Sequence, residues 1–406
     1  MHRPQGFYTL PLPVTARANA MSIPLSQRSQ NVLQSEIRSM TRECRRVNGI
    51  NMAQGVCDLP IPPPVIAAAH QAIDTGYNSY SAPEGLPGLR EAIAARMNVE
   101  HAMTIQPAWV MVSQGATGAF HATAQAVLDP GDEVILFEPY YGYHAATLHA
   151  LGCSLRYVRM SPPDWPLPQQ ALEAAIGPRT RAIVISNPSN PSGKVYQREE
   201  LEWLGQLCQR HKLVLFSDEI YEHFVYDGRV HIPPATLPAL RERTITLSGF
   251  SKIFSITGWR LGYAIAPPEV IEAASRFNDL IYVCAPTPLQ QAAIAGLTEL
   301  DNGFYRQVCA EHAHKRQLFC DTLARIGLPP AIPQGAYYVM ADVSSLPGKD
   351  DRAKAMHILQ QTGIASVPGR AFYHDHGGAQ QLRFCFAKRE DALAQACRRL
   401  ESLGRA

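Results

Sequence analysis

Short apolar runs alternate with helix-like segments through the middle of the chain. These runs have the length and the apolar content of buried strands: AWVMVS (108–113), EVILFEP (133–139), RAIVISN (181–187), KLVLFSDE (212–219), RTITLSGF (243–250) and LGYAIA (261–266). Between them, GATGAFHATAQAVL (115–128) predicts a helix, and EELEWLGQLCQRH places Leu201, Leu204 and Leu207 on one helical face. Such alternation is typical of an α/β protein, in which a mostly parallel sheet lies between helices.

The pattern changes from about residue 310 onwards. A long helix-like stretch, HAHKRQLFCDTLARIG, is followed by the strand-like segments YYVMADV (337–343) and LRFCFA (382–387). This order predicts a smaller α+β domain, and we expect the N-terminal segment up to about residue 60 to pack with it. The predicted organisation is therefore a flexible arm at 1–32, a small domain from 33–60 and 310–406, and a large α/β domain at 61–309.

Composition and charge narrow the range of functions. The 406 residues are 46% hydrophobic and 18% charged, which suits a globular protein with a sizeable core. The net charge of +2 gives no reason to expect nucleic acid or an anionic membrane as partner. No apolar run approaches the roughly 18 residues of a transmembrane helix. The nine cysteines are scattered without a CxxC pair, which argues against a disulfide framework and predicts a reducing, cytoplasmic location.

The N-terminal segment leaves two interpretations open. Prolines interrupt its apolar residues, so it lacks the hydrophobic stretch of a secretory signal. It contains arginine and no acidic residue, which keeps a mitochondrial presequence open, although the prolines would break an amphipathic helix. A flexible arm, or translation starting at Met21, is the favoured interpretation.

A glycine-containing turn, SQGATGAF (113–120), stands between a predicted strand and a predicted helix. Such a turn exposes backbone N–H groups at a helix N-terminus, where a phosphate binds readily. The alternative is a turn that only tight strand–helix geometry requires. The segment matches neither GxGxxG nor GxxxxGK[ST], so it indicates neither a dinucleotide site nor a P-loop.

Polar motifs follow two further predicted strands. In SNPSNPSGKVY (186–196), two prolines and a glycine predict a rigid turn that holds Asn190 at the sheet edge, although a plain loop is the alternative. In FSDEIYEHF (216–224), Asp218 ends a strand, and a carboxylate buried there requires a cation or a strong donor such as a protonated ring nitrogen. Tyr221 would offer its phenol to the same cavity. The alternative for Asp218 is a helix N-cap.

The segment LSGFSKIFSITGWRLGY (247–263) places Lys252 just after a strand, among apolar and small residues. A lysine desolvated there has a depressed pKa and can form a Schiff base with an aldehyde. Arg260 follows nearby and suits bidentate binding of a phosphate. The alternative is a solvated surface lysine, the usual position of this residue type.

The motifs NPSNPSG, DEIY and SGFSKIFSITGWRLGY, in this order, resemble those of the class I/II aminotransferases, which are fold-type I enzymes that use pyridoxal 5′-phosphate. The resemblance runs from about residue 33 to the C-terminus and implies a mostly parallel seven-stranded sheet in the large domain. It implies that Lys252 holds the cofactor as an aldimine and carries the Cα proton, and that Asp218 pairs with the pyridinium nitrogen. Tyr221 and Asn190 would contact the phenolic oxygen of the ring.

The resemblance assigns further site residues. Tyr141 would stack on the cofactor ring, and Gly115, Ala116 and Thr117 with Arg260 would bind its phosphate. In the substrate site, Gly55 and Arg383 would meet the α-carboxylate together with Asn190; for Arg383 the alternative is a surface arginine at a sheet edge. Tyr80 would reach the phosphate bound by a neighbouring subunit, and YVCAPTPLQ (282–290) would line the partner's pocket. The implied assembly is a homodimer with shared active sites.

Two positions depart from the family's pattern. Gly249 stands where many members carry a serine that binds the phosphate, so one phosphate hydrogen bond is in doubt. Thr117 stands where the bacterial aspartate-specific branch often has lysine, which weakens an aspartate assignment. Because YVCAPTPLQ contains no arginine for a side-chain carboxylate, neutral donors, aromatic or methionine-like, are favoured.

The histidine pairs His312/His314 and His374/His376 lack further ligands at metal spacing, so we expect solvated positions and no metal site.

Three functions remain for this sequence. The leading one is an aminotransferase that moves nitrogen from an L-amino acid to 2-oxoglutarate or pyruvate by a ping-pong mechanism. The same scaffold supports a carbon–sulfur β-lyase acting on cysteine conjugates, which would release pyruvate and ammonia without an oxo-acid acceptor. A ligand-sensing regulator would need a fused DNA-binding segment, and the N-terminal arm is too short for a winged helix.

Overall fold

The computed structural model describes residues 35–375 and 377–403, together with Ile23 and Ser26. Its main feature is a seven-stranded sheet with the strand order β2-β8-β7-β6-β5-β3-β4. β8 is antiparallel to both of its neighbours, and the other neighbouring pairs are parallel, so the predicted α/β fold is confirmed. The strands are β2 (Val110–Gln114), β3 (Glu133–Glu138), β4 (Ser154–Arg159), β5 (Thr180–Ser186), β6 (Val214–Asp218), β7 (Thr244–Gly249) and β8 (Leu261–Ile265).

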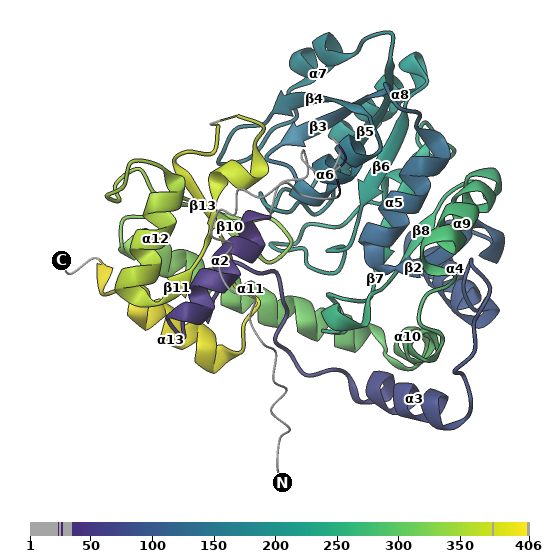
Figure 1. Cartoon of the computed structure of the whole chain (residues 1–406), viewed down its shortest axis with the longest axis horizontal. Coiled ribbons are helices and arrows are strands. Elements are labelled where there is room, and N and C mark those ends of the chain that lie inside the picture. Colours follow the sequence, from purple (N-terminus) through teal and green to yellow (C-terminus); the bar gives the residue numbers. More distant parts are fainter. Residues whose placement is uncertain (1–22, 24–25, 27–34, 376, 404–406) are drawn as a thin grey trace. The chain divides into compact units, whose positions relative to one another are not determined.

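Both faces of this sheet are covered by apolar side chains and helices. Because successive side chains of a strand point to opposite faces, Val134 and Leu136 of β3 join one core, while Ile135 and Phe137 join the other. The predicted apolar face of α8 packs in the second core. Figure 1 shows α5 running along the sheet, where it packs against β8, β7 and β2. The helices of the first core are α5 (Gly115–Val127), α6 (Gly142–Ala150) and α9 (Pro268–Tyr282), and α8 (Arg198–His211) lies in the second.

Further helices surround this part of the chain. α10 packs against both α3 and α4. These helices are α3 (Pro63–Asp74), α4 (Pro87–His101), α7 (Gln169–Ala175) and α10 (Thr287–Glu299), and short 3-10 turns occur at η1 (Pro107–Trp109), η2 (Pro234–Thr236) and η3 (Thr257–Trp259).

The C-terminal part carries a separate four-stranded antiparallel sheet, in the order β12-β13-β10-β9. Its strands are β9 (Pro330–Ala331), β10 (Tyr338–Asp342), β12 (Val367–Pro368) and β13 (Gln381–Cys385). β1 (Ile50–Asn51) pairs in parallel with β11 (Ile364–Ala365), which ties the segment after α2 to the C-terminal part. The helices around these strands are α2 (Glu36–Arg46), α11 (Asn302–Arg325), α12 (Asp351–Thr362) and α13 (Glu390–Leu400), and η4 (Gly369–Phe372) follows β12 (Figure 1).

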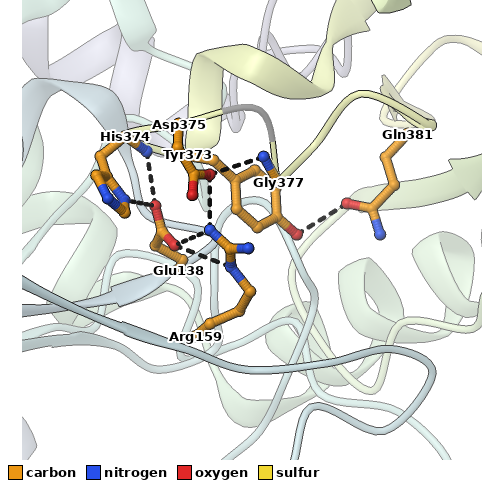
Figure 2. Close-up of polar contacts among 7 residues, drawn as sticks. All are labelled: Glu138, Arg159, Tyr373, His374, Asp375, Gly377 and Gln381. Carbon is orange, nitrogen blue, oxygen red and sulfur yellow. Dashed lines mark hydrogen bonds and ion pairs between the residues drawn. The ribbon is translucent and has the colours of Figure 1, made fainter.

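A cluster of charged side chains joins the large sheet to the segment that follows η4 (Figure 2). Glu138, the last residue of β3, is 1% exposed; its Oε1 lies 2.6 Å from the backbone N and 2.7 Å from Nδ1 of His374. Its Oε2 accepts hydrogen bonds from Arg159 at 2.9 and 3.1 Å, and Arg159 also donates to Asp375 at 2.6 Å. The cluster therefore anchors the segment that follows η4 to the carboxyl end of β3.

The histidine pairs differ in their surroundings. The predicted solvated position is wrong for His312, which is fully buried on α11 against the rings of Phe224 and Tyr337. Burial lowers the pKa of His312 to about 4. His314 is exposed, His374 belongs to the cluster above, and His376 lies outside the described residues.

The predicted arm at 1–32 also lies outside the described residues, apart from Ile23 and Ser26. Among the helices of the described part of the chain, none is both long and apolar enough to cross a membrane.

Glu222, just beyond β6, has a strongly shifted titration. Burial raises its pKa to about 7, and Ser248 donates a hydrogen bond to it at 3.0 Å. Because the folded pKa lies above the unfolded value, the folded protein binds more protons than the unfolded chain between about pH 4.5 and 7. The contribution of Glu222 to the free energy of unfolding therefore decreases as the pH rises through this range.

We expect Glu222→Gln, which keeps a polar acceptor opposite Ser248, to increase the free energy of unfolding. The gain should be about 2 kcal/mol larger at pH 8 than at pH 5. Urea unfolding at both pH values measures it, with Glu202→Gln on α8, whose side chain is 51% exposed, as the matched control. A gain of equal size at both pH values would contradict the shifted titration.

Candidate active site

A cavity of about 440 Å³ lies where the parallel strands end. Its wall contains residues that follow β2, β3, β5, β6 and β7, together with side chains from α2, β10 and β13. Ligands of open α/β sheets bind at this edge because the loops after the strands converge there. Most of the predicted site residues line this one cavity: Gly55, Ala116, Thr117, Tyr141, Asn190, Asp218, Tyr221, Lys252, Arg260 and Arg383.

Two predicted residues lie elsewhere. Gly115 does not line the cavity. Its φ of +72° favours glycine, and an added Cβ would also lie 2.6 Å from Nη2 of Arg260. Tyr80 is 83% exposed and does not line the cavity of its own chain. A role for Tyr80 in a partner's site stays a prediction.

Lys252 lies just after β7, where its amine faces the cavity. Its Nζ donates a hydrogen bond to the backbone oxygen of Gly55 at 3.1 Å. Burial, together with the positive charge of Arg260, lowers the pKa of Lys252 to about 8. A substantial fraction of the amine is therefore neutral near physiological pH, as nucleophilic attack on an aldehyde requires. The alternative of a solvated surface lysine does not describe this environment.

Asp218 is the last residue of β6 and is 6% exposed. Its Oδ2 lies 3.1 Å from Nε2 of His144, and its Oδ1 accepts a hydrogen bond from the backbone of Ile220 at 3.3 Å. The residues after it form turns, so Asp218 does not cap a helix. Among the described residues, no lysine or arginine pairs with this carboxylate, which leaves it suited to a cationic or strongly donating group of a ligand.

The N-terminus of α5 forms an anion site. Gln114 makes no side-chain cap, so the first backbone N–H groups of the helix have no side-chain partner there. An added Cβ at Gly262 would clash with the backbone N of Ala116, so only glycine at this position lets β8 pass this close to the start of α5. Arg260 adds a guanidinium at the same place. Helix terminus and guanidinium together suit a phosphate.

The departure at Gly249 has a steric reason. An added Cβ there would lie 2.7 Å from Cα of Gly262 and 2.9 Å from the backbone oxygen of Leu261, so a serine would not fit. Ser251 lines the cavity and offers a hydroxyl instead.

Arg383 on β13 is 1% exposed, so the alternative of a surface arginine is wrong. Its guanidinium donates to Asn190 Oδ1 at 2.8 Å and to the backbone oxygen of Ala53 at 2.5 Å. It packs over the rings of Tyr338 at 4.2 Å and Phe372 at 5.0 Å, and its Nε has no hydrogen-bond partner. No carboxylate of the described residues pairs with it. A buried, uncompensated cation of this kind favours an anionic ligand.

Among the cavity residues that the sequence interpretation missed, four form hydrogen-bonded or charged pairs there. His144 contacts Asp218 as described, and Tyr338 lies with its hydroxyl 2.8 Å from that of Tyr221. Arg38 and Tyr143 form a further hydrogen-bonded pair in the wall. One signal was available for His144, which stands one helical turn after Tyr141 in EPYYGYH. Tyr338 falls in a strand-like apolar run, where a tyrosine indicates core packing.

Comparison with known proteins defines the class of the protein. The profile of the class I and II aminotransferases matches residues 47–400, and the chain belongs to this family. It is 35% identical over 376 residues to the aspartate/prephenate aminotransferase of Thermus thermophilus, covering 91% of this chain and 95% of the relative. It is 32% identical to kynurenine–oxoglutarate transaminase 1 of Mus musculus, with 89% and 93% covered.

The fold comparison agrees with the sequence comparison. N-succinyldiaminopimelate aminotransferase from Mycobacterium tuberculosis superimposes with a TM-score of 0.90 and 31% identity, covering 94% of this chain and all of that one. The protein is therefore a fold-type I aminotransferase, and the cofactor of this family is pyridoxal 5′-phosphate.

The residues of the cavity fit this cofactor. Lys252 offers a partly neutral amine for its aldehyde, Asp218 a carboxylate for its ring nitrogen, and the start of α5 with Arg260 an anion site for its phosphate. When bound, the cofactor supplies an electron sink for the charge left at Cα after deprotonation.

Proposed function

We propose that this enzyme transfers the amino group of an L-amino acid to a 2-oxo acid in two half-reactions within this cavity. The observation that carries the proposal is Arg383, a buried guanidinium without a carboxylate partner among the described residues, in the same cavity as the reactive amine of Lys252. An α-carboxylate bound by Arg383 and Asn190 would supply the missing charge and orient the substrate.

Each side chain then has a defined task. Nζ of Lys252 would accept the proton from Cα of the amino acid and deliver it to the cofactor carbon that had carried the aldehyde; in the second half-reaction it would move a proton in the opposite direction. Asp218, held by His144, would accept a hydrogen bond from the ring nitrogen of the cofactor and keep that nitrogen protonated. Tyr221, fixed by Tyr338, would present its hydroxyl to the cofactor, and Tyr141 would stack on the cofactor ring.

The proposal includes a homodimer with shared active sites. Large apolar side chains exposed to solvent support an interface that includes them: Tyr80, Leu280 and Ile281 are 83%, 81% and 44% exposed. In this arrangement Tyr80 would reach the phosphate in the partner's site.

For the amino donor we propose a neutral side chain, aromatic or methionine-like, in preference to aspartate. Thr117 in place of lysine, and the lack of arginine in 282–290, support this choice. The named relatives act on aspartate and prephenate, on kynurenine and on N-succinyldiaminopimelate, so the family as a whole leaves the donor open.

The near-ultraviolet and visible spectrum of the purified enzyme tests the proposal, with amino acids added singly and no oxo acid present. We expect the band of the lysine-bound cofactor to convert to that of the aminated cofactor with neutral donors and much less with aspartate. A band that persists while pyruvate and ammonia accumulate would instead establish the carbon–sulfur β-lyase. If no cofactor band forms after pyridoxal phosphate is added, the site assignment is wrong.

A further inference from the structure

Arg38 is the cationic side chain of the cavity wall that the assignments above leave without a task. It lies on α2, near the start of the described chain, whereas the other site arginines, Arg260 and Arg383, lie in its second half. Its side chain is exposed to solvent. Among the residues lining the cavity, the positive side chains are Arg38, Lys252, Arg260 and Arg383, and the acidic one is Asp218. Arg260 is assigned to the cofactor phosphate, Lys252 to its aldehyde and Arg383 to the α-carboxylate, so Arg38 is the cation of this wall without an assigned partner.

The guanidinium of Arg38 is oriented by an aromatic pair. Its Nε donates a hydrogen bond to the hydroxyl of Tyr143 at 3.3 Å. The ring of Tyr143 stacks on that of Tyr141, with 5.3 Å between their centroids and 24° between their planes. No carboxylate of the described residues forms an ion pair with Arg38. Because Nε is occupied, the two terminal nitrogens remain as a planar fork of the kind that binds a carboxylate through two hydrogen bonds.

Arg38 and Arg383 line the same cavity but differ in burial, and this difference indicates which carboxylate each would bind. Arg383 is 1% exposed, so an empty site leaves a desolvated charge, whereas Arg38 remains hydrated when nothing binds it. An α-carboxylate, present in every substrate, suits the buried arginine. A second carboxylate that only one substrate of the pair carries suits the exposed one, because a neutral donor can occupy the cavity without stranding a buried charge.

We propose that Arg38 binds the distal carboxylate of the 2-oxo acid, so that the amino acceptor is a dicarboxylic oxo acid of the 2-oxoglutarate type rather than pyruvate. The inference rests on the proposed aminotransferase function and names the substrate class of its second half-reaction. Arg38 is then a specificity-determining residue: it recognises the end of the acceptor that does not react. Tyr143 is its positioning residue.

Steady-state kinetics of the holoenzyme with one active neutral donor test this inference. The measured quantity is kcat/KM for 2-oxoglutarate divided by kcat/KM for pyruvate. The wild-type ratio should be well above one, and Arg38→Gln should reduce it about tenfold or more, mainly through the KM for 2-oxoglutarate. Arg38→Lys, which keeps the charge but loses the fork, should fall between the two. Tyr143→Phe should lower the ratio by a smaller factor.

Arg42→Gln is the matched control, since Arg42 lies one turn further along α2, is exposed, and does not line the cavity. It removes the same charge from the same helix and should leave the ratio as in the wild type. If Arg42→Gln lowered this ratio equally, the effect would come from the positive charge of α2 as a whole rather than from Arg38, and the inference would be overturned. It is equally overturned by a wild type that uses pyruvate as well as 2-oxoglutarate, or by an unaltered ratio in Arg38→Gln. An absence of amino transfer to either acceptor would instead contradict the proposed function.

Discussion

Lys252→Ala will abolish amino transfer while leaving a folded protein. The loss should be at least about a thousandfold in kcat, because the substitution removes both the nucleophile for the cofactor and the base for the Cα proton. The fold should persist because the amine makes one hydrogen bond, to the backbone oxygen of Gly55, and its removal relieves a desolvated charge. Turnover and the circular dichroism spectrum measure the two effects.

Lys252→Arg is the sharper control for this prediction, because it keeps a positive charge in the wall but cannot form the Schiff base. It should be as inactive as Lys252→Ala. In the wild type without cofactor, the rate of reaction with added pyridoxal phosphate should rise with pH, reach half its maximum near pH 8, where half of the amine is neutral, and level off at higher pH. A variant at this position that retains full transamination would contradict the assignment of the reactive lysine.

Arg383→Leu will reduce kcat/KM for amino acid substrates by about two to three orders of magnitude, because a desolvated partner of the α-carboxylate is lost. The stability of the protein without substrate should change by less than about 1 kcal/mol. Two hydrogen bonds, to Asn190 and Ala53, are removed, but the cost of a buried charge without a carboxylate partner is removed with them. Steady-state kinetics and urea unfolding of the apoprotein give the two quantities.

Arg316→Leu is the matched comparison for this prediction. The side chain of Arg316 is also buried, at 7% exposed, but it forms a two-point ion pair with Asp227 at 2.6 and 2.7 Å, away from the cavity wall. Its loss should lower the free energy of unfolding by about 1–3 kcal/mol with little effect on kcat/KM. If Arg383→Leu destabilised the apoprotein as strongly, Arg383 would be a structural rather than a substrate-binding residue.

The fold was predictable where the hydrophobic pattern is local and unambiguous. β2, β3, β5, β6, β7 and β8 all lie within the apolar runs identified in the sequence or within two residues of their limits. β4 was not predicted, because the sequence analysis identified strands as continuous apolar runs, whereas Ser154–Arg159 is an edge strand whose polar and apolar residues alternate. The environment of His312 was also misjudged, since a lone histidine on a helix does not reveal which elements cover it.

The residues of the candidate site likewise divide into those that the sequence identified and those that it missed. Lys252, Asp218 and Asn190 were found because each follows an apolar strand, and the ends of parallel strands meet at one edge of a sheet. His144 and Tyr338 were not found, because their contacts with Asp218 and Tyr221 join segments distant in sequence.

The sequence by itself determined the order of strands and helices and the motifs that define the family, because hydrophobic periodicity and motif spacing are local properties of the chain. The tertiary structure alone decided which charges have partners. It buries Arg383 without a carboxylate among the described residues, sets His144 against Asp218, and leaves Arg38 exposed in the cavity wall. Burial and pairing decide the cost of a charge and therefore the ligand that it favours, and both depend on long-range packing that no local pattern contains.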